Sequence, residues 1–165
     1  MMTEARNEVS EGLRRKAEAA IHAVARAIDD DRLEAFPEFF LEEGSYKVAS
    51  RFNLARGLPL AQINCTNRAM IADRIVSLRK ANIYQPHYYR HLISGIEITA
   101  GPDRSLLARS NYLVMRSMED GSGSSIFSSG EYRDVLAVDG DEVKFRERVV
   151  VFDGKSIETL LVIPL

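Results

Sequence analysis

The sequence predicts an α+β domain in which helices pack on one face of a curved, mostly antiparallel sheet. Two periodicities favour this class. The first third of the chain has apolar residues at the three- and four-residue steps of helices, whereas the part after Tyr88 has the two-residue rhythm of strands. Two or three helices followed by a run of strands are typical of the α+β class. No glycine-rich phosphate loop, internal repeat or alternation of strands and helices indicates another class.

The composition describes one domain with a real core. The chain has 165 residues, of which 45% are apolar and 28% charged, and we expect a single domain over residues 1–165, with 1–18 as a flexible or helical extension. A net charge of -2 and a pI near 6.0 provide no basic footprint for nucleic acid. No apolar run approaches the roughly 20 residues of a membrane helix, and the charged N-terminus does not resemble a secretory signal. We therefore expect a cytoplasmic protein with neither nucleic acid nor membrane as partner.

Residues 10–28 are expected to form the first helix, with Ser10 at its start. The acidic residues 29–31 end this helix, and one of their carboxylates is expected to cap a short second helix. Pro37 fits in the early part of that second helix. The apolar positions of the two helices are Leu13, Ala17, Ile21, Val24, Ala25 and Ile28, and then Leu33, Phe36, Phe39 and Phe40.

The middle of the chain combines short elements with a long connection. Residues 42–45 are expected to be a turn and 46–50 a strand. Residues 52–67 read as an irregular connection, which compact domains keep for a purpose such as partner binding. A helix over 68–82 follows, and Pro86 terminates it. This helix should point Ile71, Ile75 and Leu78 inward and leave Asp73, Arg74, Arg79 and Lys80 mostly solvated.

The remainder is expected to be a meander of strands joined by turns at 101–103, 119–123 and 139–141. The first strand carries Leu92, Ile96 and Ile98. Residues expected to share one side of a strand are Leu106, Ala108, Ser110, Tyr112 and Val114, and then Ile126, Ser128, Gly130 and Tyr132. In the next strand Val143, Phe145, Val149 and Val151 should be packed, with Lys144, Arg146 and Arg148 on a charged opposite face. Residues 157–163 are expected to close the sheet.

The histidines and the cysteine predict no metal or cofactor site in this chain. A mononuclear iron site needs three converging ligands, such as two histidines and a carboxylate. His22 lies on the first helix, while His87 and His91 lie in a loop and a strand, so the three are not expected to converge. A Rieske cluster takes two cysteines and two histidines. Cys65 is the single cysteine, and it reads as a small packing or loop residue.

Two carboxylates have apolar or small neighbours in their strands. A buried Glu131 or Glu147 has either a paired cation or a raised pKa, and acids with raised pKa values serve in proton transfer. One hypothesis is therefore an isomerase or cyclase that uses Glu147 or Glu131, with His91, as acid and base. The alternative is a structural ion pair with Arg133, Arg109 or Arg116, because arginines are abundant on the same strands.

The most polar and aromatic connection joins the middle helix to the first long strand. Planar arginine and histidine side chains beside aromatic rings make stacked and charge-assisted contacts, within one chain or between chains. For Arg74 and Arg79, on the middle helix, the default interpretation is a solvated helix face. The alternative is that they form salt bridges to a partner. The candidates for an interface are Arg74, Arg79, Tyr84, His87, Tyr89, Arg90 and His91.

The same segment carries a family resemblance. The pattern D-R-I-x-x-L-R-x-A-N-I-Y from Asp73 to Tyr84, followed by H-Y-Y-R-H at 87–91, is similar to the beta subunits of bacterial aromatic-ring-hydroxylating dioxygenases. Within that family it most resembles the small subunits of terephthalate dioxygenases and salicylate hydroxylases. The motifs S-G-E-Y at 129–132 and R-E-R-V at 146–149, and the apolar residues 159–165, extend the resemblance over much of the chain.

The resemblance implies a cone-shaped NTF2-like fold, also called SnoaL-like or cystatin-like, which ketosteroid isomerase shares. It further implies a subunit without catalytic residues, present as a homotrimer of beta subunits within an alpha3beta3 hexamer. In that family the alpha subunit carries a Rieske 2Fe–2S cluster, a mononuclear Fe(II) and the substrate pocket, and NADH supplies electrons through a reductase. An aromatic carboxylate is the substrate class that the resemblance suggests. A stand-alone isomerase or cyclase, or a small-molecule binding module, remains the alternative for the same fold.

Overall fold

The computed structural model describes residues 9–81, 83–157 and 161–165. Six strands form one sheet in the order β2-β1-β6-β5-β4-β3. All neighbouring strands pair antiparallel except β1 and β6, which are parallel. The strands are β1 (Phe40–Ser50), β2 (Ile63–Cys65), β3 (His87–Ala100), β4 (Leu106–Met118), β5 (Ser124–Asp139) and β6 (Glu142–Phe152). The helices are α1 (Glu11–Asp29), η1 (Leu33–Phe39), α2 (Arg51–Ala55), α3 (Arg68–Lys80) and η2 (Pro102–Arg104).

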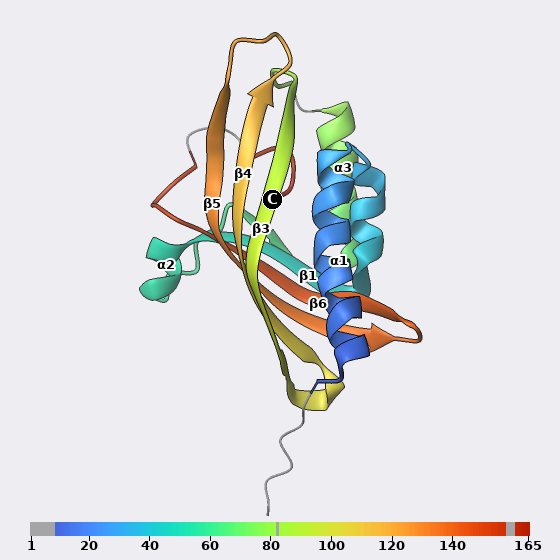
Figure 1. Ribbon diagram of the computed structural model, residues 1–165. Helices are drawn as coiled ribbons and strands as arrows, with labels where there is room; N and C mark the ends of the chain where they lie inside the picture. Colours follow the sequence, from blue (N-terminus) through green and yellow to red (C-terminus); the bar gives the residue numbers. More distant parts are fainter. Residues whose placement is uncertain (1–8, 82, 158–160) are drawn as a thin grey trace, which may run out of the picture.

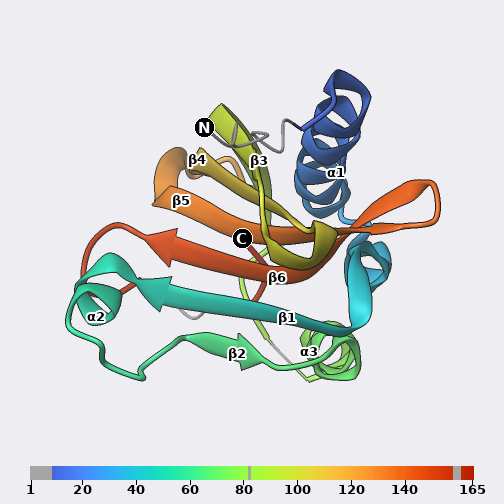
Figure 2. The ribbon, with the colours of Figure 1, turned by 90° about the horizontal axis from the view of Figure 1, so that it is seen from below.

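The sheet curves around the two longer helices. Figure 1 shows α1 and α3 on one face of the sheet, with the long strands β3, β4 and β5 rising beside them, and Figure 2 shows η1 between the two helices. Viewed from below, the strands bend from β2 to β3 around the space that the helices fill (Figure 2). The core lies between these two layers, and the predicted α+β class with helices on one face of a curved, mostly antiparallel sheet is confirmed.

The first helix forms as predicted. The Ser10 hydroxyl accepts a hydrogen bond from the backbone N–H of Leu13, which satisfies one of the free donors at the start of α1. The buried face of the helix consists of Ala17, Ile21, Val24, Ala25, Ala27 and Ile28. Residues 1–8 of the predicted extension lie outside the described residues, and the rest of that extension, 9–18, leads into and forms the first turns of α1.

The predicted cap between the first two helices is wrong. The short second helix, η1, is a 3-10 helix whose N-cap is Arg32, and no side chain caps it. The carboxylate of Asp29 bonds to His91 on β3, and that of Asp31 bonds to Arg79 on α3. These acidic side chains therefore connect α1 to other elements of the fold instead of capping the next helix.

The first strand is longer than predicted, because the expected turn at 42–45 is part of β1. Its pairing with β6 shifts register between Phe40 and Ser45, so the segment bulges instead of turning. A Cβ on Gly44 would lie 2.8 Å from the carbonyl oxygens of Leu41 and Phe145, so the bulge requires a glycine here. The connection 52–67, expected to be irregular, contains most of α2 and the edge strand β2.

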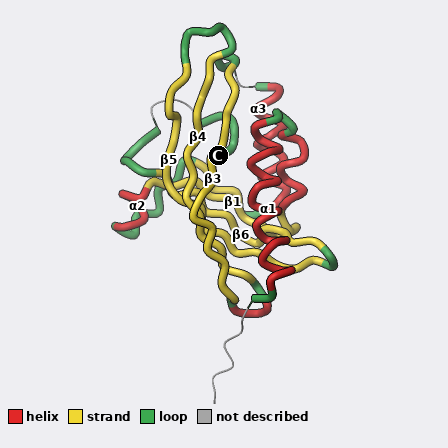
Figure 3. The backbone as a smooth tube through the Cα atoms, viewed as in Figure 1, coloured by secondary structure: helices red, strands yellow, loops and turns green. Residues whose placement is uncertain are grey.

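The middle helix and the hairpins agree with the sequence. Ile71, Ile75 and Leu78 are the buried residues of α3. The helix ends at Lys80, and the predicted last residue, Asn82, lies outside the described residues. The turns between β3 and β4, β4 and β5, and β5 and β6 fall at the three predicted positions, and the first of them contains η2 (Figure 3).

Two bulges change which side chains face the core. Arg146 is an extra residue in β6, because Glu147 pairs with Val135 while Phe145 pairs with Leu136. The alternation therefore changes after it, so Arg148 is buried and its predicted place on the charged face is wrong. Phe127 is an extra residue in β5 in the same way, and Ile126 is 62% exposed instead of sharing the packed side with Ser128.

The last residues do not close the sheet as predicted. Residues 158–160 lie outside the described part of the chain, and neither Ile157 nor Leu161–Leu165 belongs to a strand. Instead, Leu161–Leu165 is buried as an irregular segment against the core. The Tyr46 hydroxyl fixes this segment, because it accepts a hydrogen bond from the Leu165 backbone N–H and donates one to the Leu165 carbonyl oxygen. Over the residues described, no helix combines the length and apolarity that crossing a membrane requires.

Candidate functional site

The aromatic segment, residues 84–91, leads from the loop after α3 into β3. Alternate residues of a strand point to the same side, and here the rings of His87, Tyr89 and His91 form an inward row. The ring centroids of Tyr84 and His87 are 5.5 Å apart, those of His87 and Tyr89 5.0 Å, and those of Tyr89 and His91 6.3 Å. Tyr88 and Arg90 lie on the opposite face of the strand and are exposed.

His91 ties the end of α1 to β3. Its Nδ1 lies 2.6 Å from Oδ1 of Asp29, and its backbone N–H donates to the same carboxylate at 3.0 Å. The His91 side chain is fully buried, and its Nε2 has no hydrogen-bond partner. The contact predicted for this histidine is thus made within the chain, to a residue that sequence analysis considered only as a helix cap.

The two helical arginines of the interface prediction also bond within the chain. Arg79 Nε donates to Oε1 of Glu34 at 2.8 Å, and Arg79 Nη1 to Oδ1 of Asp31 at 3.0 Å. The hydrogen bond from Arg79 lowers the pKa of Glu34 below its ordinary value. Arg74 Nη2 donates to the carbonyl oxygen of Leu161 at 2.7 Å. Arg79 therefore fixes η1 against α3, and Arg74 fixes residues 161–165 against it. The prediction that both side chains are mostly solvated did not foresee these contacts.

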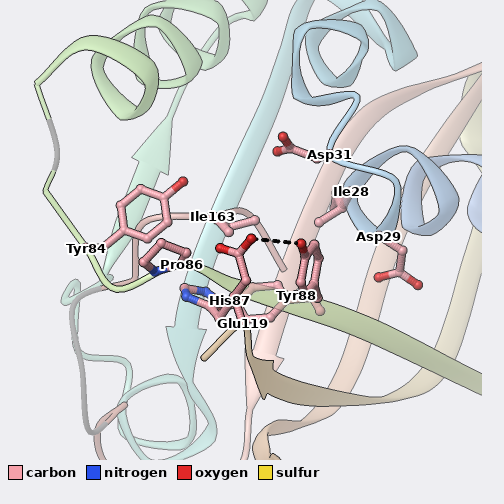
Figure 4. A pocket seen from close by; sticks show the side chains of 10 residues that line it. Ile28, Asp29, Asp31, Tyr84, Pro86, His87, Tyr88, Glu119 and Ile163 are labelled. Carbon is pink, nitrogen blue, oxygen red and sulfur yellow. Dashed lines mark hydrogen bonds between the residues drawn. The ribbon is translucent and has the colours of Figure 1, made fainter. Parts of the chain in front are cut away.

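A cavity of about 260 Å³ lies beside the aromatic segment (Figure 4). The Tyr88 hydroxyl donates to Glu119 at 3.3 Å across its edge. Its lining comes from the end of α1, the aromatic segment and the buried last residues: Ile28, Asp29, Asp31, Tyr84, Pro86, His87, Tyr88, Tyr89, Glu119 and Ile163. Three carboxylates, one histidine and three tyrosines give this hollow a polar lining.

The structure decides between the two interpretations of Glu131. Its side chain is 4% exposed and bonds to two guanidinium groups, with Arg109 Nε at 2.8 Å and Arg133 Nε at 2.6 Å. Burial acts to raise the pKa of Glu131, but the hydrogen bonds from the two arginines lower it below its ordinary value. The ion-pair alternative is therefore confirmed for Arg109 and Arg133, and a raised-pKa acid at this position is excluded.

Glu147 is an exposed residue, so its predicted burial is wrong. The bulge at Arg146 places Glu147 on the outer side of β6 and moves its neighbour Arg148 into the core. Of the three groups in the isomerase or cyclase hypothesis, only His91 lies inside the fold with an unpartnered nitrogen.

The charged pair that sequence analysis missed lies in the middle of the core. Arg148 donates to Asp134 through Nε at 2.9 Å and through Nη2 at 2.8 Å. Its guanidinium carbon lies 4.3 Å from the ring centroid of Tyr132 and 4.4 Å from that of Phe145. Burial acts to lower the pKa of Arg148, but the Asp134 carboxylate outweighs burial and raises it. The available signal was Asp134 itself, which shares strand parity with the apolar Tyr132 and Leu136.

Within the described residues, no group of three or more His, Cys, Asp or Glu side chains could hold a metal ion. Cys65 is a free, buried cysteine at the end of β2, and burial raises the pKa of its thiol. The packing role expected of this residue agrees with its place in the core.

Comparison with known proteins gives one consistent family. The family model described as "Ring hydroxylating beta subunit" matches residues 23–159. The chain is 38% identical over 138 residues to the anthranilate 1,2-dioxygenase small subunit of Burkholderia cepacia, covering 84% of this chain and 85% of that protein. It is 34% identical over 143 residues to subunit beta 1 of the terminal oxygenase component of terephthalate 1,2-dioxygenase from Comamonas, covering 87% and 92%.

A solved structure agrees with the sequence relatives. The crystal structure of a beta subunit assigned to an aromatic-ring-hydroxylating dioxygenase of Novosphingobium aromaticivorans superimposes with a TM-score of 0.85 at 35% identity. The match covers 96% of this chain and 100% of that one. Both the predicted NTF2-like fold and the predicted family resemblance are confirmed by these matches.

Proposed function

Because the chain belongs to the family of ring-hydroxylating beta subunits, and is the small subunit of a ring-hydroxylating dioxygenase, we propose that its role is structural. The chain itself carries out no chemical step. It forms a homotrimer that supports the large subunits of an alpha3beta3 hexamer in the cytoplasm, where the complex oxidises an aromatic carboxylate. The relatives are small subunits of anthranilate and terephthalate dioxygenases, which supports this substrate class.

The observation that carries the structural role is the uncovered outer face of β3, β4 and β5. The helices pack on the inner face of the sheet, so the opposite side of these long strands has no cover within the described residues (Figure 1). Leu92 is 53% exposed and Ile126 62% exposed there. Register places Leu92 beside Leu113, and Met115 between Arg90 and Ile126. Apolar side chains around an arginine are typical of protein interfaces.

The interface residues predicted from sequence divide between two proposed tasks. Arg90 lies exposed at the edge of the outer-face patch, which consists of Leu92, Leu113, Met115 and Ile126, and we propose that it contacts a sister chain. Arg74, Arg79, Tyr89 and His91 act mainly by holding their surroundings in shape, since their side chains bond or pack within the chain. Tyr84 and His87 line hollows at the same end of the molecule and stay candidates for contact with the large subunit.

The redox groups belong to the large subunit in this proposal. The Rieske cluster and the mononuclear iron would supply electron transfer and oxygen chemistry there, with NADH as the electron source through a reductase. The small subunit offers the base, a sheet braced by the Asp134–Arg148 pair.

The experiment measures the absolute mass of the purified chain by size-exclusion chromatography with light scattering. We expect about three times 18.5 kDa, and a complex with the large subunit on co-expression. Arg90→Ala should weaken the trimer, whereas Arg15→Ala, at a side chain of α1 that is 76% exposed, should leave it intact. A stable monomer or dimer that never associates with a large subunit would contradict the proposal. It would favour the isomerase or cyclase alternative, of whose three candidate groups only His91 lies inside the fold with an unpartnered nitrogen.

A further inference from the structure

A second hollow, of about 400 Å³, lies between the loop after α3 and the end of β4. This second hollow, called the Arg116 pocket below, is distinct from the cavity of Figure 4, although Tyr84 and His87 line both. Its lining consists of Tyr84, His87, Arg116, Met118 and Val162 together with Ile83 and Gln85. The lining contains one permanent cation and no carboxylate. Its volume falls in the range of about 300–1,000 Å³ typical of small-ligand sites.

Arg116 has no acidic partner among the described residues, unlike Arg109 on the same strand and Arg133 on the neighbouring strand β5. Arg148 on β6 forms an ion pair too. Its Nε is buried and has no hydrogen-bond partner. The guanidinium carbon lies 5.0 Å from the ring centroid of Phe127, which holds it over an aromatic face. A partly buried cation without a counter-ion is costly, so an anion at this site would be stabilised.

His87 adds a second unsatisfied group to the same pocket. Its Nδ1 lies 2.7 Å from the carbonyl oxygen of Gln85. A carbonyl oxygen only accepts, so Nδ1 carries the hydrogen, and in the neutral ring Nε2 is left as an acceptor. This Nε2 is buried and has no partner. The ligand that satisfies it must bring an N–H or O–H donor.

We propose that this pocket binds a small aromatic carboxylate that also carries an amino or hydroxyl group. The carboxylate pairs with the Arg116 guanidinium, the donor group bonds to Nε2 of His87, and the ring packs among Tyr84, Met118 and Val162. This is a binding site of the small subunit itself, separate from any pocket in the large subunit. It does not depend on the proposed trimer, because every group named belongs to one chain.

The test is titration of the full-length chain, followed by isothermal calorimetry and by the ¹⁵N–¹H signals of arginine side chains. The probes are anthranilate, which has a carboxylate and an amino donor, benzoate, which lacks the donor, and aniline, which lacks the carboxylate. We expect anthranilate to bind more tightly than benzoate, benzoate more tightly than aniline, and the Arg116 signal to shift.

Variants separate the two contacts. Arg116→Gln should weaken anthranilate binding by tenfold or more, and Arg116→Lys should retain part of the affinity because it keeps the charge. His87→Phe should bring anthranilate close to the affinity of benzoate and leave benzoate unchanged. The matched control is Arg56→Gln, since Arg56 also lies over a phenylalanine ring, at 3.6 Å from Phe52, but far from the pocket. Circular dichroism checks that each variant is folded.

Two results would overturn the proposal. One is absence of binding by the folded wild-type chain at millimolar anthranilate. The other is that the carboxylate is not recognised, which would appear either as equal affinity for anthranilate, benzoate and aniline or as a folded Arg116→Gln variant that binds anthranilate as the wild type does.

Discussion

At the scale of single residues, the main feature of the core is a buried ion pair. Asp134 and Arg148 are each about 1% exposed at their side chains and bond to each other through two hydrogen bonds. Such a pair gains little over apolar residues of the same volume, but removing one partner leaves a buried charge without compensation. The rings of Tyr132 and Phe145 on both sides of the guanidinium exclude other partners from it.

Asp134→Asn is therefore expected to destabilise the protein by about 3 kcal/mol, because it leaves Arg148 charged and buried. Urea unfolding of the purified chain measures the change in the free energy of unfolding. Arg146→Gln serves as the control, because Arg146 is an exposed arginine on β6, two residues before Arg148. It should change the free energy of unfolding by less than about 0.5 kcal/mol. A similar small effect of Asp134→Asn would show that the pair does not carry a buried charge.

The Glu131 cluster predicts how stability depends on pH. The two arginines lower the pKa of Glu131 in the folded state, so the folded form binds the proton less readily than the unfolded chain. The contribution of Glu131 to stability is then present above the unfolded pKa of about 4.3, and it is lost as pH falls through the lower folded pKa. Glu131→Gln should be less stable at neutral pH and should lose less stability on acidification. Thermal unfolding from pH 7 to pH 3 measures this, with Glu147→Gln, an exposed carboxylate on the neighbouring strand, retaining the wild-type slope. Parallel curves for Glu131→Gln and wild type would contradict the assignment.

At the scale of elements, the sequence was informative where local chemistry decides the structure. The Ser10 cap and the inward residues of α3 follow from residue type and spacing, and so do the hairpins. The bulges do not, because an extra residue such as Arg146 or Phe127 is defined only by its partner strand. One unrecognised bulge inverts every later position, which is why Arg148 and Glu147 were assigned to the wrong faces.

The sequence identified the aromatic segment of the candidate site but not the residues that its side chains contact. The aromatic segment was identified from its composition, but the partners of its side chains come from elements far away in sequence. Asp29, which bonds to His91, is 62 residues away, and Asp31, which bonds to Arg79, is 48 residues away. Long-range pairs of this kind leave no periodic signal in one sequence, so an internal contact and an interface contact are indistinguishable until the chain is folded.

Gly130 marks a place where β5 and β6 approach too closely for a side chain. A Cβ there would overlap with the carbonyl oxygen of Val151 and lie 2.9 Å from the Cα of Phe152. Gly130→Ala should therefore destabilise the protein by about 1–3 kcal/mol, as overpacking does.

Gly12→Ala is the opposite case: nothing lies within 4 Å of its added Cβ, in the first turn of α1. It should stabilise by up to about 1 kcal/mol, because alanine favours the helix. Thermal unfolding of both variants tests the signs, and a neutral Gly130→Ala would show that the strands can separate without cost.

At the scale of the whole molecule, the interior of the cone is filled by the chain's own residues. The Asp134–Arg148 pair, the aromatic residues around it and the segment Leu161–Leu165 occupy the space between sheet and helices. Two buried groups without a hydrogen-bond partner, His87 Nε2 and His91 Nε2, belong to the aromatic segment, and a third, Arg116 Nε, lies on the residue that pairs with Tyr89. The largest uncovered feature is the outer face of β3, β4 and β5. A family member that acts by assembly is expected to use that face, since burying its apolar side chains is favourable.

Leu92→Glu tests this within the outer-face patch. Leu92 is 53% exposed, so a glutamate is tolerated in the isolated chain. In an assembly it would bury a charge beside Leu113, its partner on β4, and beside its symmetry-related copies. We expect the trimer to dissociate at concentrations where the wild type stays assembled, with no loss in the unfolding temperature of the monomer. Val76→Glu places the same charge at a similarly exposed apolar residue of α3, where Val76 is 50% exposed, and should leave the trimer intact. If light scattering finds both variants trimeric, the sister chains meet through another surface, and the outer face of the sheet is available to the large subunit instead.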